Sequence, residues 1–98
     1  MMNTIDNFMK EGKIKMIQKT EIEIRLTEMM KVYDFVKTCG TFESSIDVSS
    51  MNNRYIVDGK SLLGILGLDL SKNVRAILFS NNEDEINRFT TEMEKFAC

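Results

Sequence analysis

Residues 57–68 have the sequence Val57-Asp58-Gly59-Lys60-Ser61-Leu62-Leu63-Gly64-Ile65-Leu66-Gly67-Leu68. This stretch predicts the end of a strand, followed by a serine that caps a short apolar helix. A serine at a helix N-cap accepts a hydrogen bond from a free backbone N–H of the first turn, and the same place favours an added phosphate. The stretch therefore predicts both a change of secondary structure and a candidate site at Ser61.

The segment that follows the first 19 residues predicts a strand and then a helix. Residues 20–26 alternate apolar and polar side chains, a pattern that is typical of a half-buried strand. Thr27 is expected to be the N-cap of the helix, and the Glu28 carboxylate adds favourable charge in its first turn. Gly40 suits the end of this helix. The predicted buried stripe consists of Met29, Val32, Val36 and Cys39.

Three more strands are predicted around the helix that Ser61 begins. Residues 43–49 and 54–60 predict two strands joined by a turn over 50–53, which is too short for a parallel crossover. The apolar helix is expected over 61–68. After a loop, residues 74–79 predict the fourth strand.

A last helix is predicted at the end of the chain. Asn81 or Asn82 is expected to cap it, and Glu85 lies three residues beyond Asn82, the spacing of a capping box. The apolar stripe of this helix consists of Ile86, Phe89, Met93 and Phe96.

The order of these elements is strand, helix, strand, strand, helix, strand, helix. Because one face of the sheet is apolar and three helices are present to cover it, the sequence predicts an α+β open-faced sandwich. Its sheet would have four antiparallel strands, with the three helices on one face. Residues 1–19 have weak periodicity and are predicted to be an N-terminal extension, whereas residues 20–98 form the domain.

Composition excludes several classes of function. With 98 residues, the chain is long enough for one domain. Its net charge is −2 and its basic residues are dispersed, which argues against a nucleic-acid surface. It has neither an apolar run long enough to cross a bilayer nor a signal peptide with an apolar centre, so we expect a cytoplasmic protein without membrane contact.

Two cysteines and the absence of histidine argue against a metal site or an activated thiol nucleophile. Cys39 lies on the apolar stripe of the first predicted helix and is expected in the core, whereas Cys98 is expected to be exposed. The chain also lacks a P-loop, a dinucleotide fingerprint and a nucleophile elbow, so no cofactor is expected.

The run Lys60-Ser61-Leu62-Leu63-Gly64, followed by Leu66-Gly67-Leu68, resembles the regulatory-serine segment of HPr. HPr is the small phosphocarrier of the bacterial sugar phosphotransferase system. The resemblance extends from about Glu21 to Phe96 and is most specific over residues 55–73. It implies the HPr fold, whose order of elements is the one predicted above.

The start of the first helix departs from the HPr pattern. In that family a His-x-Arg-Pro sequence begins the helix, and the histidine accepts phosphate from Enzyme I. This chain has no histidine. Counting back from Phe35 places Glu28 near the histidine position, Met30 near the arginine and Lys31 near the proline. The resemblance therefore implies loss of phosphohistidine chemistry. Glu28 is either a fixed charge that imitates the phosphorylated state or an ordinary acidic residue of a first helical turn.

Two interpretations of Ser61 stay open. It can be a plain N-cap, commonly worth about 1 kcal/mol. The resemblance implies instead a target of the HPr kinase/phosphorylase, a serine kinase, after which the modified surface docks on a transcription regulator. The helix after Ser61 is apolar nearly all round, so at least one of its large side chains should stay exposed for a partner. The candidate docking residues are Leu62, Leu63, Ile65 and Leu66.

The sequence thus predicts an HPr-like regulatory or adaptor module that is not an enzyme and acts through the helix starting at Ser61. One alternative is a degenerate phosphocarrier component that uses another residue or competes for Enzyme I. Another is a structural interaction domain that could dimerise.

Overall fold

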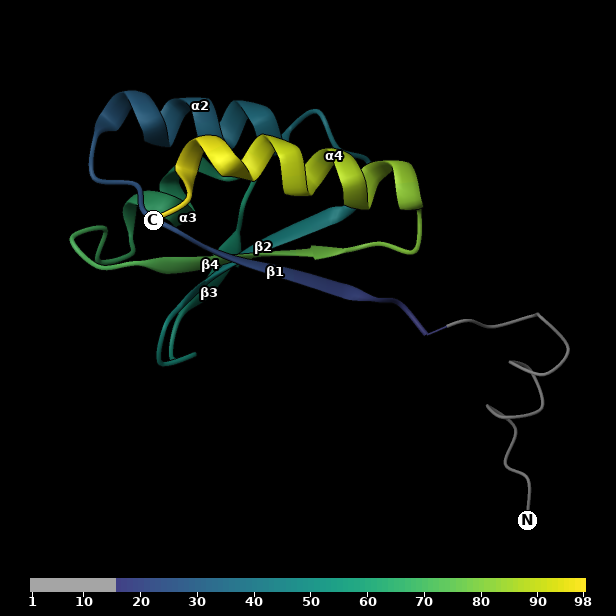
Figure 1. The fold of residues 1–98 in the computed structure, drawn as a ribbon. Helices are drawn as coiled ribbons and strands as arrows, with labels where there is room; N and C mark the ends of the chain where they lie inside the picture. The colour runs from purple at the N-terminus through teal and green to yellow at the C-terminus, as the bar shows by residue number, and fades with distance from the viewer. Residues whose placement is uncertain (1–15) are drawn as a thin grey trace, which may run out of the picture.

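A four-stranded antiparallel sheet forms the base of the domain in the computed structural model, which describes residues 16–98 (Figure 1). The strands pair in the order β1-β4-β2-β3, so the first and fourth strands in sequence are neighbours. Their bounds are β1 (Lys19–Ile24), β2 (Ser45–Ser50), β3 (Ile56–Asp58) and β4 (Val74–Phe79).

Within residues 16–98, three helices cover one face of this sheet, and Figure 1 shows none of them on the other face. They are α2 (Met29–Cys39), α3 (Leu62–Leu66) and α4 (Glu83–Met93), and a short 3-10 helix η1 (Glu94–Phe96) follows α4. This arrangement confirms the predicted α+β open-faced sandwich and its order of elements. Within residues 16–98, no helix combines the length and apolar character that a bilayer crossing requires.

The core lies between the sheet and the helices. Alternate side chains of β2 and β4 are buried in the core, whereas Ile22 of β1 and Val57 of β3 are partly buried against it. Two edge-to-face aromatic pairs lie above this layer: Phe35 of α2 meets Phe96 of η1 with ring centroids 5.5 Å apart, and Phe42 of the α2–β2 loop meets Phe89 of α4 at 6.0 Å. Each fully buried large side chain contributes about 1.5–3 kcal/mol, so this layer fixes where the helices lie.

The start of α2 differs from its prediction. The N-cap is Glu28 rather than Thr27, and Glu28 makes no side-chain hydrogen bond to the helix. Met29, predicted in the buried stripe, is 46% exposed, whereas Phe35, which the stripe omitted, is fully buried. The inward face runs Val32, Phe35 and Cys39, at three- and four-residue spacing, and Met29 lies in the first turn with no described neighbour to cover it.

The hairpin is also shorter than predicted, because β3 has only three residues. Asn53 adopts a φ of 61° in the turn, and the Tyr55 N–H donates to Ser50 Oγ at 3.1 Å instead of to a strand partner. Turn chemistry therefore occupies residues that the sequence pattern assigned to a strand.

Residues 1–15 of the predicted N-terminal extension lie outside the described residues. Met16 and Gln18 are joined to the loop before α4: the Gln18 N–H donates to Asn81 Oδ1 at 2.9 Å, and Asn81 Nδ2 donates to the Met16 carbonyl at 3.0 Å. Strand β1 begins one residue earlier than predicted, at Lys19.

Candidate functional site

Ser61 is the N-cap of α3, as the sequence predicted. Its backbone is extended, and its Oγ accepts a hydrogen bond from the Gly64 N–H at 3.1 Å. The Ser61 N–H donates in turn to the Asp58 carbonyl at 3.0 Å, which joins the cap to the end of β3. Gly64 is suited to this place because a Cβ there would lie 3.2 Å from the Val57 Cβ and 3.3 Å from Ser61 Oγ. The hydroxyl is thus held at the start of the helix on a half-buried residue.

The four candidate docking residues of α3 divide into two pairs. Ile65 is fully buried and Leu62 is partly buried against the core, so this pair faces the sheet. Leu63 is 83% exposed and Leu66 is 41% exposed, and this pair faces outward. The split follows from helix geometry, since residues three apart share a face. Burial removes Ile65 from the surface that a partner can touch, and Leu63 and Leu66 are the members that remain most accessible.

Helix α2 packs against α3 and exposes apolar side chains of its own. Glu28 is exposed at its N-cap, and Met30 and Tyr33 are 69% and 50% exposed. Sequence reasoning missed Met30 and Tyr33 as surface residues. Their position could have identified them, because both lie off the buried stripe, on a face of α2 that is otherwise charged. Two neighbouring helices therefore present apolar groups close to the start of each helix.

The two cysteines differ in reactivity because one is buried. Burial of Cys39 raises the pKa of its thiol to about 12, although the nearby Lys60 ammonium acts in the opposite direction. Cys98 is exposed. We expect a thiol reagent at neutral pH to modify Cys98 rapidly and Cys39 only after unfolding, because the thiolate is the nucleophile. Mass spectrometry of the native and urea-unfolded protein measures this, and rapid double labelling of the native protein would contradict it.

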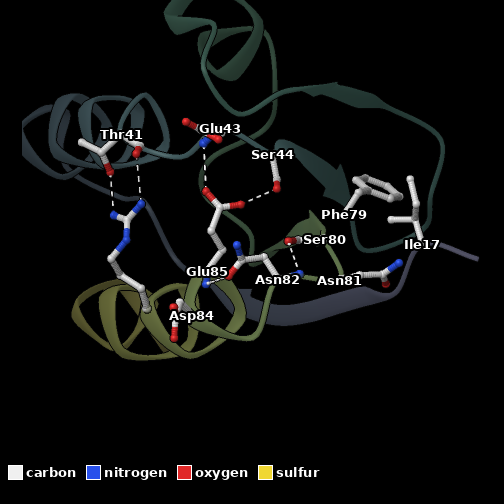
Figure 2. Close-up of a pocket in the computed structure, with 11 residues that line it drawn as sticks. Ile17, Thr41, Glu43, Ser44, Phe79, Ser80, Asn81, Asn82, Asp84 and Glu85 are labelled. Carbon is white, nitrogen blue, oxygen red and sulfur yellow. Dashed lines mark hydrogen bonds between the residues drawn. The ribbon is translucent and has the colours of Figure 1, made fainter. Parts of the chain in front are cut away.

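A pair of side chains on α4 holds the loop between α2 and β2 (Figure 2). The Arg88 guanidinium donates to the Thr41 hydroxyl at 2.8 Å and to the Thr41 carbonyl at 3.0 Å, and it lies 3.7 Å from the centroid of the Phe42 ring. The Glu85 carboxylate accepts from the Glu43 N–H at 2.9 Å and from the Ser44 hydroxyl. These contacts fix residues 41–44 against α4.

The capping box predicted for α4 forms only in part. Asn82 is the N-cap, and its Oδ1 accepts from the Glu85 N–H at 3.1 Å. The Asn82 N–H does not bond to the Glu85 carboxylate, because it donates to Ser80 Oγ at 3.0 Å. The Glu85 carboxylate instead accepts hydrogen bonds from the Glu43 N–H and the Ser44 hydroxyl.

The Glu85 contacts make stability depend on pH. The Ser44 hydroxyl, followed by backbone N–H groups, lowers the pKa of Glu85 from its ordinary value of 4.5. A lowered pKa in the folded state stabilises the protein fully above pH 4.5, and this stabilisation is lost as pH falls through the folded value. We expect Glu85→Gln to cost about 0.5–1 kcal/mol at neutral pH and less at low pH.

Urea unfolding of the unchanged protein and of Glu85→Gln, from neutral pH to below pH 4.5, measures the difference between their free energies of unfolding. The pKa of Asp69 is also lowered, by hydrogen bonds from Ser71, but Asp69 is present in both proteins and cancels in the comparison. A Glu85→Gln effect that stays constant as pH falls would contradict this role of the carboxylate.

Within the described residues, no group of three or more histidine, cysteine, aspartate or glutamate side chains is arranged to hold a metal ion. The polar groups that converge are the cap at Ser61 and the contacts of Glu85 and Arg88. The Ser61 hydroxyl contacts a backbone N–H, and the Ser44 hydroxyl contacts the Glu85 carboxylate, whose other oxygen accepts from the Glu43 N–H.

The sheet order, the helices on one face and the capped serine before α3 define a small α+β open-faced sandwich. The model of the family described as "PTS HPr component phosphorylation site" matches residues 13–97. The chain therefore belongs to the HPr family of the phosphotransferase system, as the resemblance implied. Proteins of this family are phosphocarriers rather than enzymes and interact with other proteins of that system. Neither curated protein sequences nor solved structures give a significant match.

Proposed function

We propose that this HPr-family protein is a regulatory or adaptor module that does not carry phosphate on histidine. The observation that carries the proposal is the absence of histidine from the whole sequence, in a chain that matches the family over residues 13–97. Near the position where the family has its histidine, this chain has Glu28, an exposed helix N-cap residue. A carboxylate cannot replace imidazole in reversible phosphoryl relay at that place.

Ser61 is the proposed site of regulation. Its hydroxyl already contacts the Gly64 N–H, and a phosphate there would add about −1.5 to −2 charge beside the backbone N–H groups of α3. The modification would therefore change the charge of a surface that also exposes Leu63 and Leu66. The proposed partners are a serine kinase/phosphorylase and a transcription regulator of the bacterial cytoplasm, and the chain acts by binding rather than by catalysis.

Two incubations test the proposal. With Enzyme I and labelled phosphoenolpyruvate, the purified protein should acquire no acid-labile phosphate, because it lacks an imidazole acceptor. With HPr kinase/phosphorylase and ATP, it should acquire one phosphate on the peptide that contains Ser61. Ser61→Ala should abolish this phosphate, and the control Ser71→Ala, a change at an exposed serine before β4, should leave it intact.

The two arms separate the alternatives. Acid-labile label on this chain would favour a degenerate phosphocarrier and overturn the loss of carrier activity. Failure of the kinase to modify Ser61 would remove the regulatory role and leave Ser61 as a helix cap in an interaction domain.

A further inference from the structure

One cavity of the described residues lies away from α3. Its volume is about 740 Å³, and it opens between the α2–β2 loop, the end of β4 and the first turns of α4 (Figure 2). Cavities of this size commonly hold small ligands. Its walls are held in place before any ligand arrives, because Glu85 and Arg88 fix the loop on one side. On the other side, the Ser80 N–H donates to the Gln18 carbonyl at 3.1 Å.

The polar groups in this cavity have hydrogen-bonding capacity left over. Ser80 Oγ accepts from the Asn82 N–H, which leaves the Ser80 hydroxyl proton free to donate. Asn82 Oδ1 accepts from the Glu85 N–H, and Asn82 Nδ2 has no hydrogen bond within residues 16–98. Ser44 donates to Glu85 and keeps its lone pairs as acceptors. Ser80 and Asn82 therefore offer donors to the cavity, and Ser44 offers an acceptor.

The other end of the cavity is apolar. Figure 2 shows the Phe79 ring and Ile17 together on the side away from Thr41. Both line the cavity, and Ile17 is 63% exposed. A ligand that fits must therefore combine hydrogen-bonding groups with C–H surface.

The charge of the lining disfavours anions. Among residues 16–98, the carboxylates of Glu43, Asp84 and Glu85 line the cavity, and the one cationic side chain that lines it, Arg88, is occupied by Thr41 and the Phe42 ring. A phosphorylated or carboxylated ligand would meet like charge without a free counter-charge.

We propose that this cavity binds a neutral polyhydroxylated ring, of the size of a mono- or disaccharide. Each hydroxyl of such a ligand both donates and accepts, which matches Ser44, Ser80 and Asn82, and its C–H groups contact Phe79 and Ile17. The proposal does not depend on the role of Ser61 or α3, because neither lines the cavity.

Titration of the full-length protein with methyl β-glucopyranoside, followed by ¹⁵N NMR, tests this site. We expect saturable shifts at residues that line the cavity, with a Kd of about 1–10 mM, since the site is open and few groups are immobilised. Glucose 6-phosphate should bind at least about fivefold more weakly, because its phosphate meets the carboxylates.

The variant Asn82→Asp keeps the oxygen that caps α4 but replaces the free Nδ2 donor by a carboxylate oxygen. It should weaken glucoside binding by at least about fivefold. The matched control Asn73→Asp changes an asparagine that does not line the cavity and should leave binding unchanged.

Absence of saturable shifts up to about 100 mM glucoside would overturn the proposal, because a site of the expected Kd would then be nearly filled. Equal or tighter binding of glucose 6-phosphate would overturn it too, as would unchanged binding by a folded Asn82→Asp variant. If that variant does not fold, the comparison of the two probes on the unchanged protein still decides the matter.

Discussion

Replacing Phe89 by alanine is expected to reduce the free energy of unfolding by about 3–5 kcal/mol, the range found when a buried phenylalanine is truncated. Phe89 is fully buried on the inner face of α4, and its ring meets the Phe42 ring edge to face at 6.0 Å. Its removal loses the burial of the ring and leaves a cavity beside Phe42, whose other contact is the Arg88 guanidinium. A domain of this size has only about 5–15 kcal/mol of stability, so the variant should be close to unfolding at physiological temperature.

Urea unfolding followed by circular dichroism measures this loss. The matched control is Tyr33→Ala, which truncates an aromatic residue that is 50% exposed and should change stability by no more than about 0.5 kcal/mol. A loss below about 1 kcal/mol in Phe89→Ala would show that the core does not depend on this ring as the structure indicates.

Local patterns were sufficient for most of the elements and for the candidate serine. Strand β4 has the predicted bounds, and three of the four residues in the predicted stripe of the last helix are buried, although Ile86 is only partly buried and Phe96 lies in η1 beyond α4. The cap at Ser61 was predictable, and that of α4 was narrowed to Asn81 or Asn82, because each cap is a contact between a side chain and a backbone N–H three residues away.

Contacts between distant segments could not be predicted in the same way. Nothing in the spacing indicated that Arg88 would bond to Thr41, 47 residues earlier, or that Glu85 would leave its own helix cap for Ser44. These pairings depend on how α4 lies beside the α2–β2 loop, which is decided by the packing of the whole core. The cavity proposed to bind a neutral polyol is formed by these contacts between distant segments. For this reason no sequence motif predicted it.

The inward and outward faces of α3 show the same limit within a single helix. Leu62 with Ile65 and Leu63 with Leu66 are equally apolar pairs at the same spacing, so hydrophobicity alone does not say which pair is buried. The Ser61 cap and the close approach of Gly64 to Val57 orient the helix on β3, and this orientation leaves Leu63 and Leu66 outside.

The double variant Leu63→Ser with Leu66→Ser should lower the kcat/KM of HPr kinase/phosphorylase for this protein by at least about 30-fold. This is the effect expected when contact hot spots worth about 2 kcal/mol or more are removed. The physical reason is that these two side chains are the most exposed apolar groups of α3, on the helix that begins at the serine proposed to be phosphorylated. Because neither belongs to the buried core, the free energy of unfolding should change by no more than about 1 kcal/mol.

Two comparisons make this result specific to the outward face of α3. Met51→Ser with Tyr55→Ser removes two exposed apolar side chains from the β2–β3 hairpin, 44% and 65% exposed, and should leave kcat/KM nearly unchanged. Leu62→Ala should show the opposite behaviour, because Leu62 packs against the core: stability should fall while the folded protein remains a good substrate. If the Leu63 and Leu66 double variant is phosphorylated as fast as the hairpin control, the exposed side chains of α3 do not contact the kinase. Recognition of Ser61 would then have to depend on α2 and the cap alone.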